Sequence, residues 1–308
     1  MALSSSVGTP HTPGMDPPVL SEREAEIAGL DALDVPIAPA QGRLSKLWDG
    51  AWPKLTALGL FFLGWQAIVW SHWKPEYVLP GPAAVLKKVW HGLVDTNTAA
   101  GSHVLIHAAG NTLARAAVGY SISIVIGVAV GLAVSRSKIL RAGVGSMITG
   151  LQTMPTIAWL PLAVLLFKLS ETAITFVVVL GAAPAIANGV ISGVDHIPPV
   201  LLRAGRVLGA RGLGAYRHVI LPAAFPGLVA GLKQGWAFCW RSLMAGELIV
   251  IIAHKPSLGV GLQNARDFAD ATGMMAFMFV IFVIGLVIDA LFFASLERTI
   301  KRRWGLGK

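Results

Sequence analysis

The chain has 308 residues, of which 55% are hydrophobic and only 13% are charged. A soluble domain usually carries about 25% charged residues, so one aqueous core could not hide this much apolar surface. The net charge of +9 does not favour a nucleic-acid partner, because the basic residues lie between apolar runs, where they set membrane topology.

Residues 1–45 are rich in Ser, Pro and acidic residues. No apolar core follows a basic start, so the segment does not have the pattern of a signal peptide. We expect a disordered cytoplasmic tail here.

Six apolar runs follow, each close to the ~20 residues that a helix needs to cross about 30 Å of hydrocarbon. Only helices satisfy their own backbone in lipid, so we predict an all-α, polytopic membrane protein with six transmembrane helices. The runs are Leu55–Ser71, Ala116–Ser135, Ala142–Phe167, Thr172–Val194, about 226–253, and Ala271–Ile288.

The Lys and Arg residues that flank these runs are unevenly shared between the two sides, with 15 on one and 7 on the other. The richer side is predicted to be cytoplasmic, which places both termini inside, as an even number of spans requires. The basic residues 301–308 then form a cytoplasmic C-terminus.

The connection 72–115 is predicted to lie outside and to contain a helix at Pro82–Val94, which a proline turn introduces. If the second span starts earlier, at His103, Arg115 lies partly within the membrane. Whether this span starts at His103 or at Ala116 stays open. Lys168 and Glu171 lie in a short external turn, where we expect them to be solvated.

The third run contains Pro155 and Pro161, each of which removes a helix hydrogen bond. The simpler interpretation is a tolerated kink. The alternative is a broken helix whose freed backbone lines a transport path, with Thr153, Met154 and Trp159 beside it.

The fifth run carries Glu247, a charge in mid-membrane that should face the protein interior or water. Arg241 lies six residues earlier, about 240° around the helix, so the two do not share a face. We therefore expect Glu247 to bond another helix or a backbone N–H. Lys233 is expected to reach the cytoplasmic surface, and Asp289 of the sixth run to contact a neighbouring helix.

The loop between the fourth and fifth runs has a pattern typical of a helix–turn–helix. Two prolines at 198–199 start a short helix over Leu201–Leu208, and Gly209 can adopt the left-handed conformation that ends it. A second short helix, about Gly212–Ile220, leads through Pro222 into the next span. A short apolar and basic helix that projects into the cytoplasm suits a protein-docking element.

This loop resembles the EAA loop of ATP-binding-cassette importer permeases, with Gly209, the apolar Val219 ten positions on, and Leu221-Pro222 after it. In that family the loop's helix docks on the ATPase subunit and transmits its closure. Arg203 stands where the family has a leading Glu, which leaves the polarity of this contact open. The resemblance assigns ATPase coupling to Arg203, Ala204, Gly205, Leu208, Gly209, Ala210, Arg211, Val219, Leu221 and Pro222.

Further stretches are similar to the nitrate/sulfonate/taurine permease subfamily: Gln152–Leu162, Trp240-Arg241 with Ala245–Glu247, and Leu258–Gly261 with Asn264–Arg266. The resemblance covers roughly residues 55–300. It implies a type I importer permease fold over 46–300, with the coupling loop at 198–222, and import of a sulfonate, taurine, nitrate or related anion. Candidate path residues are Thr153, Met154, Pro155, Trp159, Trp240, Arg241 and Glu247.

The resemblance also implies partners in a bacterial plasma membrane. A second permease copy would enclose the path within membrane lipid, and separate ATPase chains would hold ATP and Mg. A periplasmic or lipid-anchored solute-binding protein would deliver substrate to loops 72–110 and 254–270. For this chain itself we expect no cofactor, metal, catalytic residue or nucleic-acid partner.

Two rival functions come from other classes. An ion-coupled secondary transporter would act without an ATPase and would use Glu247 or Asp289 as its buried carboxylate. An intramembrane enzyme is disfavoured because the chain has no HExxH and no GxSxG.

The chain also has no P-loop pattern, so it is not expected to hydrolyse ATP itself. Its single cysteine, Cys239, excludes an internal disulfide.

Overall fold

The computed structural model describes residues 43–94, 104–252 and 255–303, and within these ranges the chain is helical, without strands. The predicted tail at 1–45 and the basic C-terminus at 301–308 therefore lie largely outside the described residues. The elements are α2 (Arg43–Trp70), α3 (Pro82–Val94), α4 (Val104–Arg136), α5 (Lys138–Thr153), η1 (Thr156–Trp159), α6 (Leu160–Phe167), α7 (Glu171–Asp195), α8 (Pro199–Val207), α9 (Gly212–Ala215), η2 (Tyr216–Ile220), α10 (Leu221–Ile249), α11 (Leu258–Asp267), α12 (Ala271–Ile288), η3 (Asp289–Phe293) and α13 (Ala294–Arg303).

The chain divides into two units within α2, between Phe62 and Leu63. In the first unit α2 continues through Pro53 without a break. In the second unit, the indole Nε1 of Trp65 donates to the carbonyl of Pro80 at 3.2 Å, which ties the end of α2 to the turn before α3. The helix predicted at Pro82–Val94 is confirmed with these bounds.

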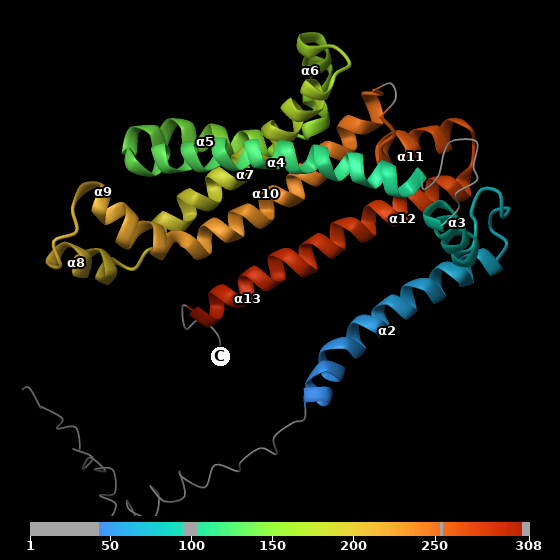
Figure 1. Ribbon diagram of the computed structural model, residues 1–308, viewed down its shortest axis with the longest axis horizontal. Coiled ribbons are helices and arrows are strands. Elements are labelled where there is room, and N and C mark those ends of the chain that lie inside the picture. The colour runs from blue at the N-terminus through green and yellow to red at the C-terminus, as the bar shows by residue number, and fades with distance from the viewer. Residues whose placement is uncertain (1–42, 95–103, 253–254, 304–308) are drawn as a thin grey trace, which may run out of the picture. The chain divides into compact units, whose positions relative to one another are not determined.

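Helix α7 is the centre of the second unit, and it lies between α4 and α10 (Figure 1). It is apolar around most of its circumference, as a fully packed membrane helix should be. Glycines bring α7 and α10 into backbone contact, because a Cβ on Gly231 would stand 2.6 Å from the Cα of Gly189. Small residues also join α4 to α7, since a Cβ on Gly127 would stand 2.7 Å from the carbonyl oxygen of Ala183.

Three helices among the described residues are long and apolar enough to cross a membrane: Val104–Arg136, Glu171–Asp195 and Ala271–Ile300. The bent pair Lys138–Thr153 and Thr156–Phe167 makes a fourth if it counts as one span, and Leu55–Trp70 is a shorter apolar helix. Helix α10 has 29 residues and contains Lys233, Arg241 and Glu247. The structure thus supports an all-helical membrane fold. Judged by helix length and apolar composition, three or four of the described helices qualify as spans.

The third apolar run is broken rather than kinked. Met154 and Pro155 both have extended backbone, with ψ of 128° and 126°, and the two helices on either side meet at 100°. A proline disfavours the helical conformation for the residue before it, which favours the end of α5 at this point. Pro161 lies in the first turn of α6, where its missing N–H costs no hydrogen bond. The kink interpretation is therefore wrong for this run.

Candidate functional site

The loop between α7 and α10 begins with α8, which ends in a Schellman motif. Gly209 has φ of +82°, its N–H donates to the carbonyl of Arg206 at 3.1 Å, and the Ala210 N–H donates to Gly205 at 2.9 Å. This pattern needs a left-handed residue after the helix, and glycine adopts that conformation without strain. The predicted left-handed turn at Gly209 is confirmed.

Helix α8 packs back on η2 through two residues of the EAA-like pattern. Gly205 is buried, and a Cβ there would stand 2.8 Å from Cγ2 of Val219. The structure thus brings Gly205 and Val219 together. Ala204, Leu221 and Pro222 are exposed.

The second half of the loop runs into α10 without a break. Tyr216–Ile220 is a π turn, in which the Leu221 N–H donates to the carbonyl of Tyr216, five residues back. Pro222 follows immediately and cannot donate, which favours a wider turn at this point. The predicted second helix is therefore present as α9 and η2, and it is continuous with α10.

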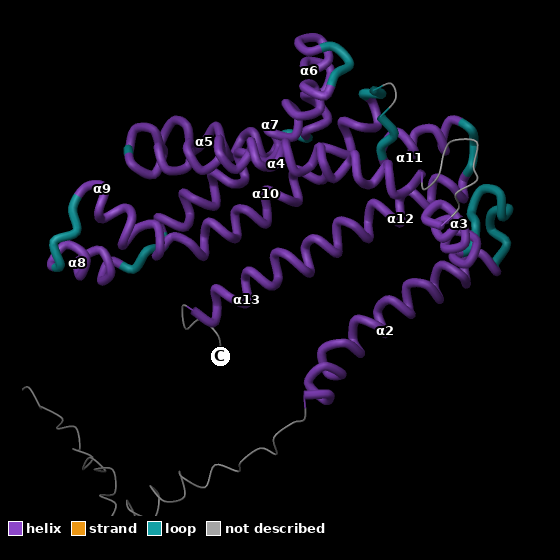
Figure 2. Tube along the Cα trace, viewed as in Figure 1, coloured by secondary structure: helices purple, strands orange, loops and turns teal. Residues whose placement is uncertain are grey.

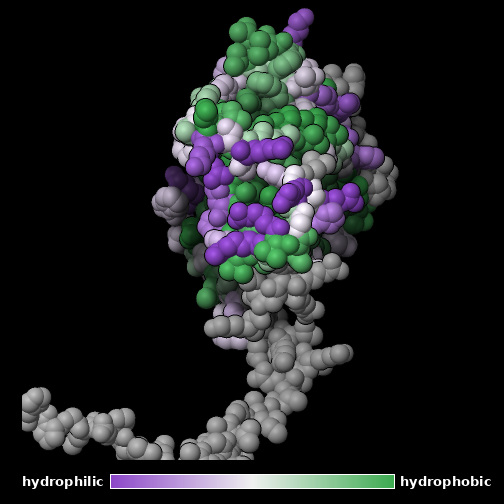
Figure 3. Space-filling view, turned by 90° about the vertical axis from the view of Figure 1, so that its left-hand side faces the viewer, coloured by the Kyte–Doolittle hydropathy of each residue, from purple (hydrophilic) through white to green (hydrophobic). Residues whose placement is uncertain are grey.

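The tip of the loop is both apolar and basic. Val207 and Leu208 are each 86% exposed, and Arg203, Arg206 and Arg211 are exposed beside them. The short turn between α8 and α9 is the teal segment at the left of Figure 2. Figure 3 looks onto this end of the molecule and shows hydrophilic residues gathered among hydrophobic ones.

A buried ionic network lies at the opposite end of α10, where the helix meets α11. The Glu247 side chain is fully buried and accepts hydrogen bonds from Arg115 Nη1 at 2.9 Å, Thr112 Oγ1 at 3.0 Å and the Gly259 N–H at 3.1 Å. The Leu258 N–H donates to Thr112 Oγ1 at 3.0 Å. Glu247 thus bonds another helix and a backbone N–H, as predicted, and it stands at the positive N-terminus of α11.

Arg115 links this buried carboxylate to the surface. Its guanidinium also forms a two-point ion pair with Glu171, at 2.7 and 3.0 Å, and Lys255 Nζ reaches the same carboxylate at 3.2 Å. Glu171 was expected to be solvated, and its side chain is 38% exposed while it carries these ion pairs. The network joins α4, α7, α10 and the loop before α11, and sequence reasoning assigned no role in it to Thr112, Arg115, Glu171 or Lys255.

Ion pairs also occur at the loop end of the helices. Lys233 Nζ lies 3.7 Å from Asp289 Oδ1 and 3.2 Å from Glu297 Oε1, so the predicted contact of Asp289 with a neighbouring helix is confirmed. Arg141 pairs with Asp195, the last residue of α7. No group of three or more His, Cys, Asp or Glu that could hold a metal occurs among the described residues.

The candidate path residues differ in their exposure to solvent. Thr153, Met154, Pro155 and Arg241 are exposed, whereas Trp159 is half-buried. Trp240 and Glu247 are buried, and Trp240 stacks on Trp236 with ring centroids 5.8 Å apart.

The break after α5 lies beside the C-terminal half of α10. A Cβ on Gly181 of α7 would meet both Thr156 Cγ2 and the Ser242 side chain, so the three residues lie together. The Ser242 hydroxyl is buried and has no hydrogen-bond partner among the described residues. The neighbouring Arg241 therefore lies at the level of the broken helix.

Helix α10 leaves one face uncovered in this chain. Ala230, Gln234, Ala237 and Arg241 are spaced by three or four residues and are all exposed; they form the α10 stripe. The Arg241 Nε donates to the carbonyl of Ala237 at 2.9 Å, and its guanidinium lies 4.7 Å from the ring centre of Phe238. No described carboxylate lies within ion-pair distance of it.

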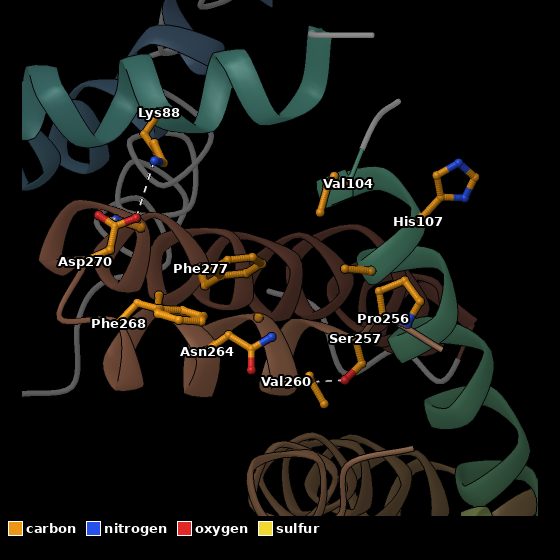
Figure 4. A pocket seen from close by; sticks show the side chains of 14 residues that line it. Lys88, Val104, His107, Pro256, Ser257, Val260, Asn264, Phe268, Asp270 and Phe277 are labelled. Carbon is orange, nitrogen blue, oxygen red and sulfur yellow. Dashed lines mark hydrogen bonds and ion pairs between the residues drawn. The ribbon is translucent and has the colours of Figure 1, made fainter. Parts of the chain in front are cut away.

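A cavity of about 640 Å³ opens at the α11 end, between α3, α4, α11 and α12 (Figure 4). Lys88 and Asp270 form an ion pair across it at 3.3 Å, and Phe277 supplies an aromatic wall. Asp270 also accepts from the Gly273 N–H at 2.9 Å and so caps α12. Lys88 and Asp270 come from the two connections that were predicted to face a binding protein, whereas Phe277 belongs to α12.

Comparison with known proteins decides the family. The model of the family described as "Binding-protein-dependent transport system inner membrane component" matches residues 123–302. The chain belongs to this family. It is thus a transport permease and a multi-pass membrane protein, and the resemblance found in its sequence is confirmed.

Relatives of the permease include proteins named for the transport of nitrate and of taurine. It is 27% identical to the nitrate import permease protein NrtB of Synechococcus elongatus, over 78% of this chain and 86% of the relative. It is 29% identical to the taurine transport system permease protein TauC of Escherichia coli, over 68% and 75% of the two chains.

Solved structures support the fold alone. The permease matches a chain of the MetNI methionine ABC transporter in an inward-facing conformation with a TM-score of 0.56 and 24% identity, over 64% of this chain and 96% of that one. A chain of an amino acid ABC transporter solved with histidines matches with a TM-score of 0.54 and 19% identity. The permease thus has an importer permease fold.

Proposed function

We propose that the permease is the membrane subunit of an ATP-driven, binding-protein-dependent importer. The observation that carries this proposal is the loop from α8 to η2. Its exposed tip is joined to α10 without a break, so a force on the tip reaches the spans. In this family context, the tip suits docking on a separate ATPase chain, which would hold ATP and Mg.

The proposed topology has six spans: the apolar half of α2, α4, the broken α5–α6 pair, α7, α10 and α12. The 15-to-7 distribution of flanking Lys and Arg supports a cytoplasmic location for both termini and for the α8–η2 loop. The cavity beside Lys88 and Asp270 then lies outside, where a solute-binding protein would dock.

In the proposed mechanism, closure of the ATPases pushes α8. Contact of Gly205 with Val219 passes the displacement to η2, and the helix continues into α10. Because Gly189 and Gly231 hold α7 and α10 in backbone contact, the two helices move as one body. The ionic network around Glu247 anchors the far end of α10 to α4 and α11.

The proposed path runs along the α10 stripe, at an interface with a second copy of the permease. Gln234 and Arg241 would be costly to expose to lipid, so this face suits water or a partner helix. Exposed Thr153, Met154 and Pro155 lie on the broken helix beside it, whereas buried Trp240 and Glu247 would support the path from behind.

The proposed substrate is a small oxyanion such as a sulfonate, taurine or nitrate. The Arg241 charge is held against α10 with no described carboxylate within ion-pair distance, which attracts an anion and repels a cation. The names of the two bacterial relatives, a nitrate and a taurine permease, support the same class.

The test is co-purification of the tagged permease from its native membranes in mild detergent. No atom lies within 4 Å of a Cβ at Gly209, so a substitution there acts through the left-handed backbone and the docking contact. Gly209→Val should lose the ATPase subunit, because a β-branched residue resists positive φ. Gly209→Asn should keep it, since asparagine tolerates this conformation.

The wild type and both variants must unfold at similar temperatures for the comparison to hold. If the folded wild type retains no ATPase chain, and proteoliposomes without an ATPase still take up solute down an ion gradient, the importer proposal is wrong. Such a transporter would need a free carboxylate, and Glu247 is fully occupied by Arg115, Thr112 and Gly259.

A further inference from the structure

The α8–η2 loop carries four exposed arginines, and these are called the loop arginines. Two of them, Arg203 and Arg206, lie one turn apart on α8, while Arg211 follows the turn and Arg217 lies on η2. They flank Val207 and Leu208, each of which is 86% exposed. The tip is therefore an apolar knob with a positive rim.

No acidic residue in the part of the chain that the structure describes neutralises that rim. The sequence from 196 to 246 contains neither Asp nor Glu. Asp195, which precedes it, pairs with Arg141 instead. No carboxylate in the described part of the chain lies within 4.0 Å of a loop arginine, although carboxylates elsewhere are paired.

The uncompensated charge opposes the folded loop. Like charges one turn apart on a helix repel each other, and the Arg206 Nε only bonds its own helix, at the carbonyl of Leu202 at 3.4 Å. Carboxylates on a partner would remove this repulsion and give each guanidinium a two-point contact. The rim is thus built for a negatively charged neighbour.

The position of the tip favours a protein over a lipid surface. Helices α9 and η2 run into α10 without a break, and the tip lies at the end of α10 remote from α11 (Figure 1). One face of α8 is already occupied, because Gly205 packs on Val219. Val207 and Leu208 lie next to the arginines, an arrangement typical of a protein interface with an apolar centre and a charged rim.

We infer that the ATPase partner has a docking groove with an apolar floor and a rim of carboxylates, and that this charge pattern selects the partner. The inference rests on the proposed function, since it describes the ATPase that the loop would bind. It predicts an association that weakens with salt and depends on the sign of the charge on α8.

The experiment uses the complex purified from native membranes, with its ATPase subunit identified by sequence and by ATP hydrolysis. Arg206→Glu should lower the retained ATPase about tenfold at moderate salt, since a rim attraction becomes a repulsion. Arg298→Glu is the matched control, because Arg298 is also exposed and its Nε also bonds a carbonyl four residues back. It should retain the ATPase as the wild type does.

A second arm identifies the opposing group. Arg206→Lys supplies an amine that a zero-length carbodiimide can couple to a carboxylate of the bound ATPase. Replacing that carboxylate by lysine should then restore retention of the ATPase by Arg206→Glu. Rescue of this kind requires direct charge pairing, which a general loss of folding could not produce.

Three outcomes overturn the inference. If Arg206→Glu retains the ATPase as well as Arg298→Glu at every salt concentration, the rim does not select by charge, while the proposed function stands. If no variant and no wild-type complex contains an ATPase, the proposed function fails as well. If phosphatidylglycerol nanodiscs stabilise the wild type but not Arg206→Glu, with ATPase retention unchanged, the loop arginines bind lipid headgroups.

Discussion

Glu247 is the residue whose environment is most completely specified in this structure. Its carboxylate is removed from solvent and surrounded by a guanidinium, a hydroxyl and a backbone N–H. A buried charge of this kind is tolerated only when its partners are all in place, because desolvation costs several kcal/mol per ion. Loss of Arg115 would leave the Glu247 charge uncompensated, and loss of Glu247 would leave the buried Gly259 N–H without its acceptor and Arg115 with Glu171 as its remaining partner.

We predict that Glu247→Ala strongly destabilises the permease. Removing one member of a buried pair typically costs about 3–5 kcal/mol, which for a chain of this size is a fall in melting temperature on the order of 10 °C. Tryptophan fluorescence during heating in detergent measures it. Asp289→Ala is the control, since this carboxylate is 45% exposed in its pair with Lys233 and should matter little. Equal melting temperatures for the two variants would show that the network carries no stability.

Helical periodicity within one run showed that Arg241 and Glu247 do not share a face, and the structure agrees. The periodicity of the run could not identify Arg115 as the partner of Glu247, because that residue lies 132 positions away on α4. Which helix faces which is set by packing between spans, and no local pattern contains it. For the same reason Glu171, at the start of α7, appeared to be an ordinary solvated residue.

At the scale of elements, the contact between α7 and α10 depends on glycines, which have no side chain to hold the two helices apart. Gly231 faces the backbone of Gly189, and Gly227 faces that of Gly193, at two positions one turn apart. No flexible side chain lies at either contact, so an added methyl group can be accommodated only by separating the helices. Close backbone approach of this kind is how membrane helices gain packing energy without a hydrophobic driving force.

We predict that Gly231→Ala lowers stability by roughly 1–3 kcal/mol, the usual range for overpacking. The matched control is Gly110→Ala in α4, where no atom lies within 4 Å of the new Cβ. Alanine is the better helix former, so that change should be neutral or stabilising by up to about 1 kcal/mol. Melting temperatures in one detergent compare the two, and a stable Gly231→Ala protein would refute the backbone contact.

Prolines show why the elements could be predicted better than their breaks. Pro53, Pro184 and Pro226 all lie inside continuous helices, whereas Pro155 ends one. A proline weakens a helix at every such position, and the surrounding contacts decide whether the chain continues. Local signals were sufficient for Pro82–Val94 and for the turn at Gly209, because the proline and the glycine determine those conformations themselves.

At the scale of the whole molecule, polarity is distributed in a way that suits one half of an assembly. Helix α10 has a buried carboxylate at one end, the exposed α8–η2 loop at the other and an exposed arginine between them. Exposed faces elsewhere are apolar: on α4, for example, Val125 is 70% exposed. Apolar faces suit lipid, whereas the α10 stripe needs either water or a second copy of the permease.

We predict that the α10 stripe is open to water. The chain has one cysteine, Cys239, which is buried, so Cys239→Ala gives a background without thiols. In that background Ala237→Cys should react with an impermeant anionic thiol reagent in native membranes, one helical turn from Arg241. The control Val125→Cys should react only with a membrane-permeant maleimide.

The charge on the reagent makes this test specific to the anion path. Arg241 should make the anionic reagent react faster than a cationic one of the same size, and Arg241→Gln should remove that difference. If Ala237→Cys instead forms cross-links between copies and excludes both reagents, the stripe is a dry interface. The path would then have to pass elsewhere, beside the break at Met154 and Pro155.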